Sequence, residues 1–418
     1  MRVTWLGHAC HLVEQGGVRV LSDPWLVDPA FDGLVEHDPP LAFGPADLPR
    51  LDALTITHGH LDHFHAPTLA AMPDKTIPVF LPPIRLTRLD EGLRLLGFHD
   101  LRPLADWQGA TVESRDGHGS LRITATPSLG VLDECAWHYA SENGSFWNGA
   151  DAPQPDVVIE EILRRFGRAD LVAVSHNSFD QPALLGLESF KEADHGPLGA
   201  LATTRTLGAK AALPAASGMR WCGPHSETIT RKVIRRSRAD FLALLGREEP
   251  AVAGLDLAPG DAWSIDGGIE RGALRGRSPE QVRCPNDYVH VVVASGARWT
   301  GTSRPDTETT FVLDLPRLTS SVPEASRHLG QTVCFFIRGE DPGVFTVDFA
   351  APGSAPIRGD AGAPFAIEVE DEDWKDLFER RIPWQTLLMS DRLRVLRVRR
   401  GAAPDGLHFA YALQAVFP

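Results

Sequence analysis

The sequence has 418 residues, with 41 Lys and Arg against 55 Asp and Glu for a formal charge of −14, and 43% of its residues are hydrophobic. This length and composition predict two or three globular domains and exclude a disordered or fibrous chain. The acidic balance, with no long basic run, argues against nucleic acid as the main partner. No run approaches the roughly 20 apolar residues of a membrane helix, and the five cysteines include no Cys-x-x-Cys pair. We therefore expect a reduced, cytoplasmic protein that acts on a small molecule.

The first hundred residues alternate short apolar strands, turns and helices. The Gly16-Gly17 pair between two of these strands predicts a β-hairpin. Apolar residues at three- and four-residue spacing predict the helices. The predicted strands are 2–6, 11–15, 18–22, 54–57 and 77–81, and the predicted helices are 67–72 and 86–98.

The middle of the chain continues this α/β pattern. Asn143-Gly144 is a dipeptide typical of a tight hairpin turn. The predicted strands are 121–128, 135–140, 145–150 and 170–177, and the predicted helices are 157–167 and 226–245.

After about residue 285 the sequence becomes richer in strands separated by Gly, Pro and Asp. The acidic run over 368–376 is predicted to be a solvated edge. The predicted strands are 288–294, 309–315, 332–338, 344–350, 365–370, 393–400 and 408–417, with one helix over 373–381. We expect two domains, residues 1–289 and residues 290–418.

The most informative stretch is a Thr-His-Gly-His-Leu-Asp-His run over residues 57–63, directly after a predicted buried strand. Its candidate ligands are His58, His60, Asp62 and His63. Four such groups on one turn can be aimed at two neighbouring points, as a dinuclear metal site requires. Packing them this closely without a cation would be costly. The run therefore predicts a metal centre at the end of a strand.

This run, with Gly7-His8 and the Asp23-Pro24 pair upstream, resembles the metallo-β-lactamase fold superfamily. The resemblance implies an αββα sandwich with two metal ions at one edge of its sheets. His58 and His60 would bind one ion, and Asp62 and His63 the other.

The resemblance also implies a bridging aspartate after the hairpin, and Asp151 is the residue that matches it. Carboxylate oxygens are suited to this role because each can bind one cation. The last ligand would be a histidine on a later loop, for which His225 is preferred and His176 is the rival.

The superfamily's hydrolases place a further histidine before that hairpin, and this sequence has none there. The nearest candidates are Asp133 and Glu134, while His138 lies further inside the strand. Exchanging an imidazole for a carboxylate makes a site harder and more anionic, which favours iron or manganese over zinc.

Four segments together resemble a narrower group, the CMP-N-acetylneuraminate hydroxylase family. They are residues 21–33, 57–64, the hairpin from 132 to 151, and residues 382–400. The likeness is strong through residue 151 and loose afterwards. It implies that Asp133 is a ligand and that the reaction is an O2-dependent hydroxylation. That family carries a Rieske cluster domain, but no Cys-x-His pair occurs here. The electrons are therefore expected from a separate electron-donor protein or from the substrate.

Two residues are expected to serve the chemistry without binding the ions. Asp23 would orient a metal-bound histidine by accepting its free N–H, and His8 would face the open coordination positions. The domain over 290–418 resembles a sterol-carrier-like α+β fold, which lines a cavity or mediates dimers.

The expected protein is a dinuclear oxygenase or hydroxylase of a small-molecule metabolite. Its expected cofactors are two iron ions, with zinc or manganese as alternatives, and O2 is the co-substrate. The alternative is a dinuclear zinc hydrolase of the lactonase or phosphodiesterase type. Whether the chain forms a homodimer stays open at this point.

Overall fold

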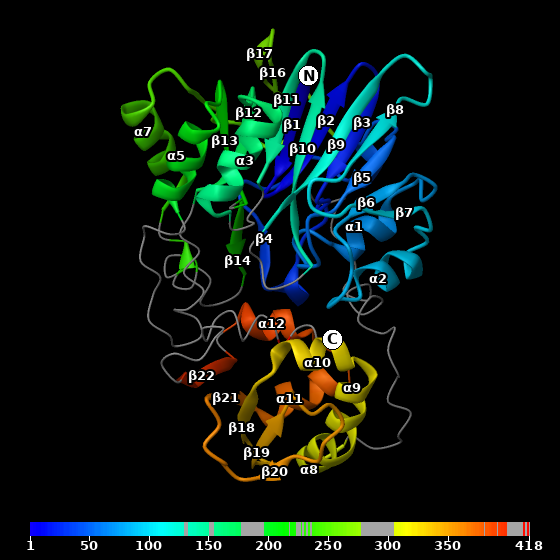
Figure 1. Cartoon of the computed structure of the whole chain (residues 1–418), viewed down its shortest axis with the longest axis vertical. Helices are drawn as coiled ribbons and strands as arrows, with labels where there is room; N and C mark the ends of the chain where they lie inside the picture. Colours follow the sequence, from blue (N-terminus) through cyan, green and yellow to red (C-terminus); the bar gives the residue numbers. More distant parts are fainter. Residues whose placement is uncertain are drawn as a thin grey trace. The chain divides into compact units, whose positions relative to one another are not determined.

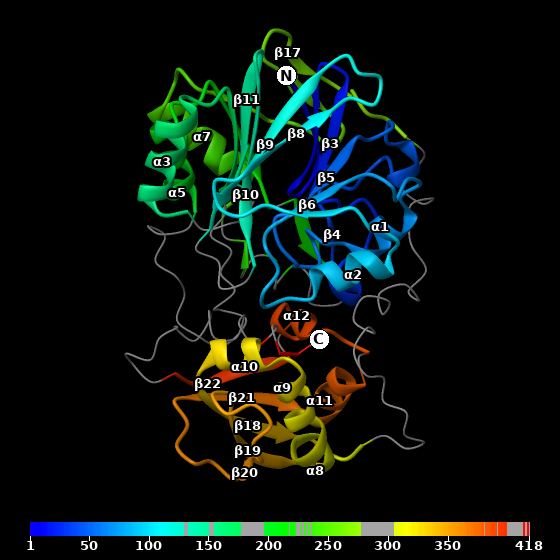
Figure 2. The same ribbon diagram turned by 45° about the vertical axis from the view of Figure 1, so that its right-hand side comes forward.

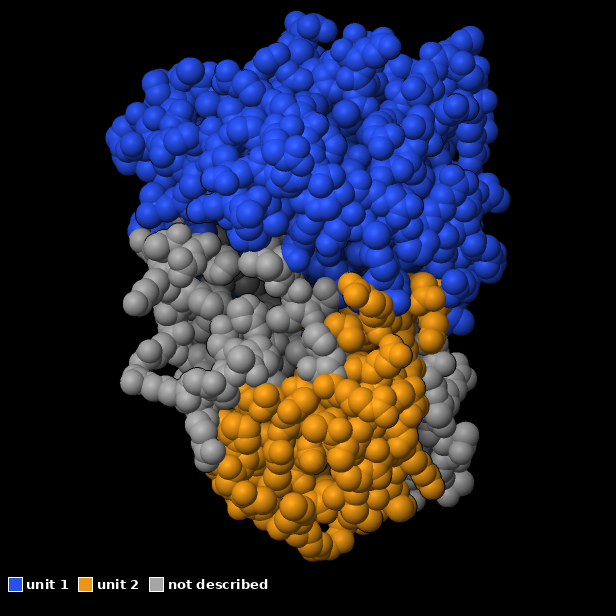
Figure 3. Space-filling model, viewed as in Figure 1, with its two compact units in different colours: residues 1–84, 93–179, 190–288 blue, residues 85–92, 180–189, 289–418 orange. Residues whose placement is uncertain are grey.

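The chain divides into two compact units, which are coloured in Figure 3. Unit 1 comprises residues 1–84, 93–179 and 190–288, and unit 2 comprises residues 85–92, 180–189 and 289–418. The computed structural model describes residues 1–128, 133–149, 154–176, 196–216, 218–222, 227, 230, 233–234, 236–276, 305–379, 381–390, 392–398, 413 and 416–417.

Most described strands of unit 1 belong to two large sheets. The first sheet has the order β17 (Gly268–Glu270), β16 (Ala262–Ser264), β1 (Arg2–Gly7), β2 (Cys10–Gln15), β3 (Val18–Ser22), β5 (Ala53–Thr55), β6 (Val79–Leu81) and β7 (Leu101–Pro103). The second has the order β15 (Ala253–Gly254), β13 (Ala211–Ala215), β12 (Leu171–Ser175), β11 (Gly144–Asn148), β10 (Cys135–Ser141), β9 (Ser120–Pro127) and β8 (Gly109–Glu113). A separate pair is formed by β4 (Val35–His37) and β14 (Met219–Trp221).

The two large sheets pack face to face, and helices lie on their outer sides (Figures 1 and 2). Trp5, Val20, Ile123 and Trp137 are among the residues of both sheets that meet in the central core. A second core lies between the seven-stranded sheet and its helices α3 (Asp156–Phe166), α5 (Pro197–Thr206) and α7 (Arg238–Glu248). The first sheet is flanked by α1 (Ala66–Ala71) beside β5 and β6 (Figure 2). These layers confirm the predicted αββα sandwich.

Other short elements connect these strands and helices along the chain. They are the helix α2 (Leu89–Leu95) and the 3-10 turns η1 (Phe31–Gly33) and η2 (Pro45–Asp47). The predicted hairpin at Gly16-Gly17 is confirmed by the antiparallel pairing of β2 with β3, and the predicted hairpin at Asn143-Gly144 by that of β10 with β11.

Alternation along β10 sends neighbouring side chains into different cores, because successive residues of a strand point to opposite faces. Trp137 and Tyr139 face the other sheet. His138 points the other way and stacks on Phe166 of α3, with ring centroids 4.1 Å apart and 15° between the planes. His138 therefore belongs to the helix-covered face.

Burial lowers the pKa of His138 from 6.5 to about 4. Between these values the unfolded chain takes up a proton that the folded chain does not, so folding stability falls as the pH falls. We expect the protonation of this residue alone to make the free energy of unfolding about 2 kcal/mol lower at pH 5 than at pH 7.5. His138→Leu should flatten the pH dependence of the unfolding free energy measured with urea. His118→Leu, at an exposed position, should not, and equal slopes for both variants would contradict the prediction.

The described residues of unit 2 from 305 onward form an α+β fold around one sheet (Figure 1). No helix in the described part of the chain has the length and apolar character needed to cross a bilayer. The sheet has the order β20 (Ile357–Arg358), β19 (Gly343–Asp348), β18 (Thr332–Arg338), β21 (Phe365–Glu370) and β22 (Leu393–Val398). The helices are α8 (Thr307–Thr309), α9 (Leu315–Ser321), α10 (Pro323–Leu329), α11 (Asp371–Phe378) and α12 (Trp384–Leu388).

The prediction of a strand over 309–315 is wrong, because this segment is helical. A π-helical turn over Thr310–Asp314 joins α8 to α9. The side chain of Asp306 caps α8 by accepting from the Thr309 amide at 2.6 Å. Phe311 then stacks on Trp374, with centroids 4.6 Å apart. Tertiary packing of this aromatic side chain thus overrides the β-propensity of the segment.

Two further expectations differ from the structure. Instead of one helix over 226–245, α7 begins at Arg238, because Ser237 caps it by accepting from the Asp240 amide. The acidic run over 368–376 is only partly solvated, because Glu368, Asp371 and Asp373 are buried while Glu370 and Glu372 are exposed. Two of the buried carboxylates are paired: Asp371 lies 3.2 Å from Lys375 Nζ, and Asp373 lies 2.9 Å from Arg392. The strands predicted over 288–294 and nearly all of 408–417 lie outside the described residues.

Candidate metal centre

Several strands of the first sheet end at one edge of unit 1. β1 and β3 run in the same direction because both pair antiparallel with β2, and β5 is parallel to β3. The residues that follow these strands therefore meet, namely His8, Asp23 and the loop over 56–65. The start of β10 from the second sheet joins them, because the Cys135 amide donates to the Thr57 carbonyl at 3.0 Å.

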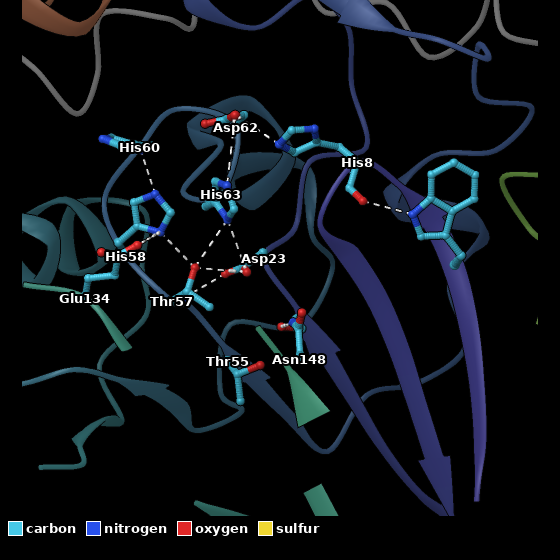
Figure 4. Close-up of polar contacts among 12 residues, drawn as sticks. His8, Asp23, Thr55, Thr57, His58, His60, Asp62, His63, Glu134 and Asn148 are labelled. Carbon is cyan, nitrogen blue, oxygen red and sulfur yellow. Dashed lines mark hydrogen bonds and ion pairs between the residues drawn. The ribbon is translucent and has the colours of Figure 1, made fainter. Parts of the chain in front are cut away.

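Polar contacts tie the two sheets together next to this edge. The Thr55 and Tyr139 hydroxyls lie 2.7 Å apart. The side-chain amide of Asn148 donates to the Ser22 hydroxyl at 3.1 Å. Figure 4 shows Thr55 and Asn148 near Asp23. These contacts fix the ends of β3 and β5 relative to the second sheet.

Asp23 organises the loop from a fully buried position. Its carboxylate accepts from the Thr57 amide at 2.8 Å and from the Thr57 hydroxyl at 3.0 Å. The same carboxylate lies 3.2 Å from Nδ1 of His63. Burial raises the pKa of Asp23, although His63 and Thr57 oppose the shift. A carboxylate at Nδ1 directs the other ring nitrogen, Nε2, away from Asp23 as a ligand atom.

His58 and His60 converge on each other. Nε2 of His58 lies 2.6 Å from Nδ1 of His60. The opposite nitrogen of His58, Nδ1, lies 2.9 Å from the Thr57 hydroxyl and 3.8 Å from a carboxylate oxygen of Glu134. Glu134 is itself held by the Ser128 hydroxyl at 2.9 Å. Figure 4 shows this arrangement beside His63.

Asp62 and His63 form a second group, which includes His8. Nε2 of His8 lies 3.0 Å from the Asp62 carboxylate, and Nε2 of His63 lies 4.0 Å from it. The three residues are buried, and each offers a ligand atom within 4.8 Å of the others. Two imidazoles and a carboxylate are donors that zinc, iron and manganese accept. The residues present therefore fit a bound cation.

Of the remaining predicted site residues, the structure describes some and leaves others outside the described residues. Asp133 is buried next to Glu134 at the start of β10. Asp151 and His225 lie outside the described residues. His176 follows β12 and packs near Phe241 of α7, with ring centroids 5.8 Å apart, and burial lowers its pKa to about 4.

Other residues lie around His8 and His58. Trp25 lies against the rings of His8 and His37, with centroids 5.4 Å and 3.8 Å away. Nδ1 of His37 lies 2.7 Å from the Asp28 carboxylate. Burial lowers the pKa of His37, although Asp28 opposes the shift. Glu134 had been named only as a neighbour of Asp133, and its contact with His58 depends on the pairing of β10 with the loop. Because Glu134 and His58 lie far apart in the sequence, residue spacing carries no signal for their contact.

Comparison with protein families now assigns the N-terminal part of the chain. Residues 2–192 match the model of the beta-lactamase superfamily domain. This part of the chain belongs to that superfamily. The resemblance and the fold expected from the sequence are thereby confirmed, and the superfamily domain includes β1 to β12 and the whole 57–63 run.

Among curated proteins, the chain is 27% identical over 192 residues to a Mycobacterium tuberculosis protein named as a Rieske 2Fe-2S iron-sulfur protein. It is 27% identical over 194 residues to N-acyl-phosphatidylethanolamine-hydrolyzing phospholipase D 1 of Caenorhabditis elegans. It is 36% identical over 85 residues to cytidine monophosphate-N-acetylneuraminic acid hydroxylase of Xenopus laevis. The matches cover 44%, 42% and 19% of this chain and 37%, 54% and 14% of those proteins.

Two solved structures align with part of the chain, and their names give different activities. A diiron beta-hydroxylase from Streptomyces venezuelae aligns with a TM-score of 0.45 and 20% identity, over 65% of this chain and 54% of that one. An isothiocyanate hydrolase from Delia radicum gut bacteria aligns with a TM-score of 0.46 and 18% identity, over 63% of this chain and 98% of that one.

Proposed function

We propose that this protein is a dinuclear metal-dependent oxygenase, with iron as its metal, that hydroxylates a small-molecule metabolite. The observation that carries the proposal is the position of the β10–β11 hairpin beside the loop over 57–63, which we call the metal loop. It brings a carboxylate, Glu134, to within 3.8 Å of His58, and Asp133 directly precedes it. The histidine of the same hairpin, His138, stacks on Phe166 on the helix-covered face instead. Where the hydrolases of the superfamily have an imidazole, this chain offers carboxylates.

A harder donor set supports the choice of metal. Carboxylate oxygens favour iron or manganese, whereas an additional imidazole suits zinc. The sequence similarity to CMP-N-acetylneuraminic acid hydroxylases supports the same reaction class. Within the proposal His58 and His60 hold one ion, Asp62 and His63 hold the other, and Asp151 bridges them. His225 completes the site, with His176 as the alternative, and either Asp133 or Glu134 supplies the remaining carboxylate.

The protein contributes position, burial and access. Asp23 and Thr57 hold the ring of His63 in one orientation, and Trp25 provides an apolar wall next to His8. Bound iron would supply the activation of O2. Hydroxylation places one oxygen atom in the substrate and releases the other as water, so it needs two electrons from a donor. We propose a separate electron-donor protein as their source.

A zinc hydrolase is the second candidate. The run over 57–63 also suits hydrolysis, and one relative at 27% identity is named as a phospholipase D. In such an enzyme the ions activate a water molecule and stabilise the developing oxyanion.

Oxygen consumption separates the two proposals. Protein loaded with iron and reduced by dithionite should consume O2 and be reoxidised within a single turnover, while zinc-loaded protein should not hydrolyse lactones or phosphodiesters. Hydrolysis by the zinc form, without O2 consumption by the iron form, would overturn the oxygenase proposal.

The hairpin carboxylates lead to a prediction about metal choice. Asp133→His and Glu134→His each introduce an imidazole at the start of β10, and the variant that replaces the ligand should raise the ratio of bound zinc to bound iron. We expect a rise of about tenfold, in line with the effect of changing groups around a metal. Elemental analysis after expression with both metals measures it. Glu142→His, in the turn after β10, is the control, and an unchanged ratio in both test variants would contradict the prediction.

A further inference from the structure

His8 occupies an unusual position in a tight turn. Gly7 pairs with Cys10, so His8 and Ala9 are the two loop residues between β1 and β2. The φ angle of His8 is +46°. A positive φ at the first position of such a loop normally selects glycine, because a side chain there is strained. The chain nevertheless has a histidine at this point.

The turn is held in place from two sides. The His8 carbonyl accepts from the Trp5 indole at 2.9 Å and from the Ala216 amide at 3.3 Å. Gly218 packs directly on the turn, because a Cβ atom at that position would lie 2.7 Å from the His8 amide nitrogen. The His8 backbone is thus fixed by contacts that do not involve its imidazole.

The imidazole of His8 is directed at the metal loop. The residue is 1% exposed, and Nε2 lies 3.0 Å from the Asp62 carboxylate. The ring meets that of His63 edge to face, with centroids 5.5 Å apart. In Figure 4, His8 approaches Asp62 from the side away from His58 and His60. His8, Asp62 and His63 thereby place their donor atoms within 4.8 Å of one another.

We propose that His8 is itself a metal ligand and completes a three-donor site with Asp62 and His63 for a divalent first-row metal ion. This differs from the sequence-based expectation that His8 only faces open coordination positions. It rests on the metal centre of the proposed function and adds to it an asymmetry between the two ions. An ion with an additional protein ligand has one fewer open position. The substrate-accessible positions then belong to the ion held by His58 and His60, and His60 is the partly exposed histidine of that pair.

The test compares metal binding by wild-type protein and His8→Asn, using Co²⁺ and Zn²⁺ alone. Asparagine tolerates a positive φ but has a shorter side chain, so the turn should persist while the donor is lost. Wild-type protein should bind two ions, and His8→Asn should bind one of them at least tenfold more weakly, with a changed visible spectrum of bound Co²⁺. His138→Asn, a buried histidine on the other face of the sheet, should bind both ions as the wild type does.

A second variant tests the same idea without removing any donor. Gly218→Ala should push the His8 backbone away from the metal loop and weaken binding of the same ion. Gly246→Ala is its control, because a Cβ atom there meets nothing within 4 Å. Melting of the metal-free proteins, followed by circular dichroism, establishes that the variants fold.

The outcomes separate this inference from the proposed function. If wild-type protein binds two ions and both His8→Asn and Gly218→Ala keep them within threefold, His8 is not a ligand and the metal centre stands. If His8→Asn does not fold, the Gly218→Ala titration and the number of shifted imidazole N–H signals in wild-type protein loaded with Co²⁺ decide. If the wild type binds no ion, both the inference and the proposed function fail.

Discussion

Replacing Asp62 by alanine is expected to lower the affinity for one of the two metal ions by more than about 100-fold. Asp62 is buried, and its carboxylate is the charged member of the group that it forms with His8 and His63. Groups that only support a ligand already change affinity by about 10–100-fold, so loss of a ligand should exceed that range. Loss of the ion should remove O2 consumption as well.

Equilibrium dialysis with elemental analysis measures the loss. Asp266→Ala is the matched control, because this aspartate lies exposed in the turn between β16 and β17. The variant of Asp62 should retain the ion held by His58 and His60, since those residues do not depend on it for ligand atoms. Retention of both ions at wild-type affinity would show that Asp62 is not a ligand.

Replacing Asp23 by alanine should have the largest effect on folding, at about 3–5 kcal/mol. Asp23 is fully buried, and its removal leaves the amide and hydroxyl of Thr57 without their acceptor. It also removes the carboxylate beside Nδ1 of His63. A buried group left without its partner bears its full desolvation cost.

Asp23→Asn separates the two roles of this residue. Its amide oxygen can still accept from the Thr57 backbone, so most of the stability should remain. The negative charge that orients His63 is lost, and metal affinity should fall by about 10–100-fold. Urea unfolding and metal titration on both variants measure these effects. Wild-type metal affinity in Asp23→Asn would contradict the orienting role.

Local patterns in the sequence were sufficient for much of the fold. The loop over 57–63 was predicted to bind metal because four ionisable side chains follow one apolar strand, and the structure confirms that this loop follows β5. The two predicted hairpins depended on their glycine-containing turns, whose conformational preferences act locally. Asp23 was expected to orient a metal-bound histidine, and the structure places its carboxylate beside Thr57 and His63.

Features that depend on distant partners were not accessible in this way. The segment 309–315 has strand-like residues, but Phe311 is stacked on Phe345 and Trp374, which come much later in the chain. Likewise, the contact of Glu134 with His58 exists only because β10 meets the loop. The approach of His8 to Asp62 depends on a strained turn whose φ no spacing rule predicts. Asp151 and His225 stay predictions.

Metal content combined with Mössbauer spectroscopy distinguishes a diiron oxygenase from a zinc hydrolase. The protein would be expressed with iron and zinc both available and purified without chelators. A diiron oxygenase should contain two irons per chain in a coupled pair that dithionite reduces and O2 reoxidises. Two zinc ions with no redox response, or fewer than two metal ions per chain, would contradict it.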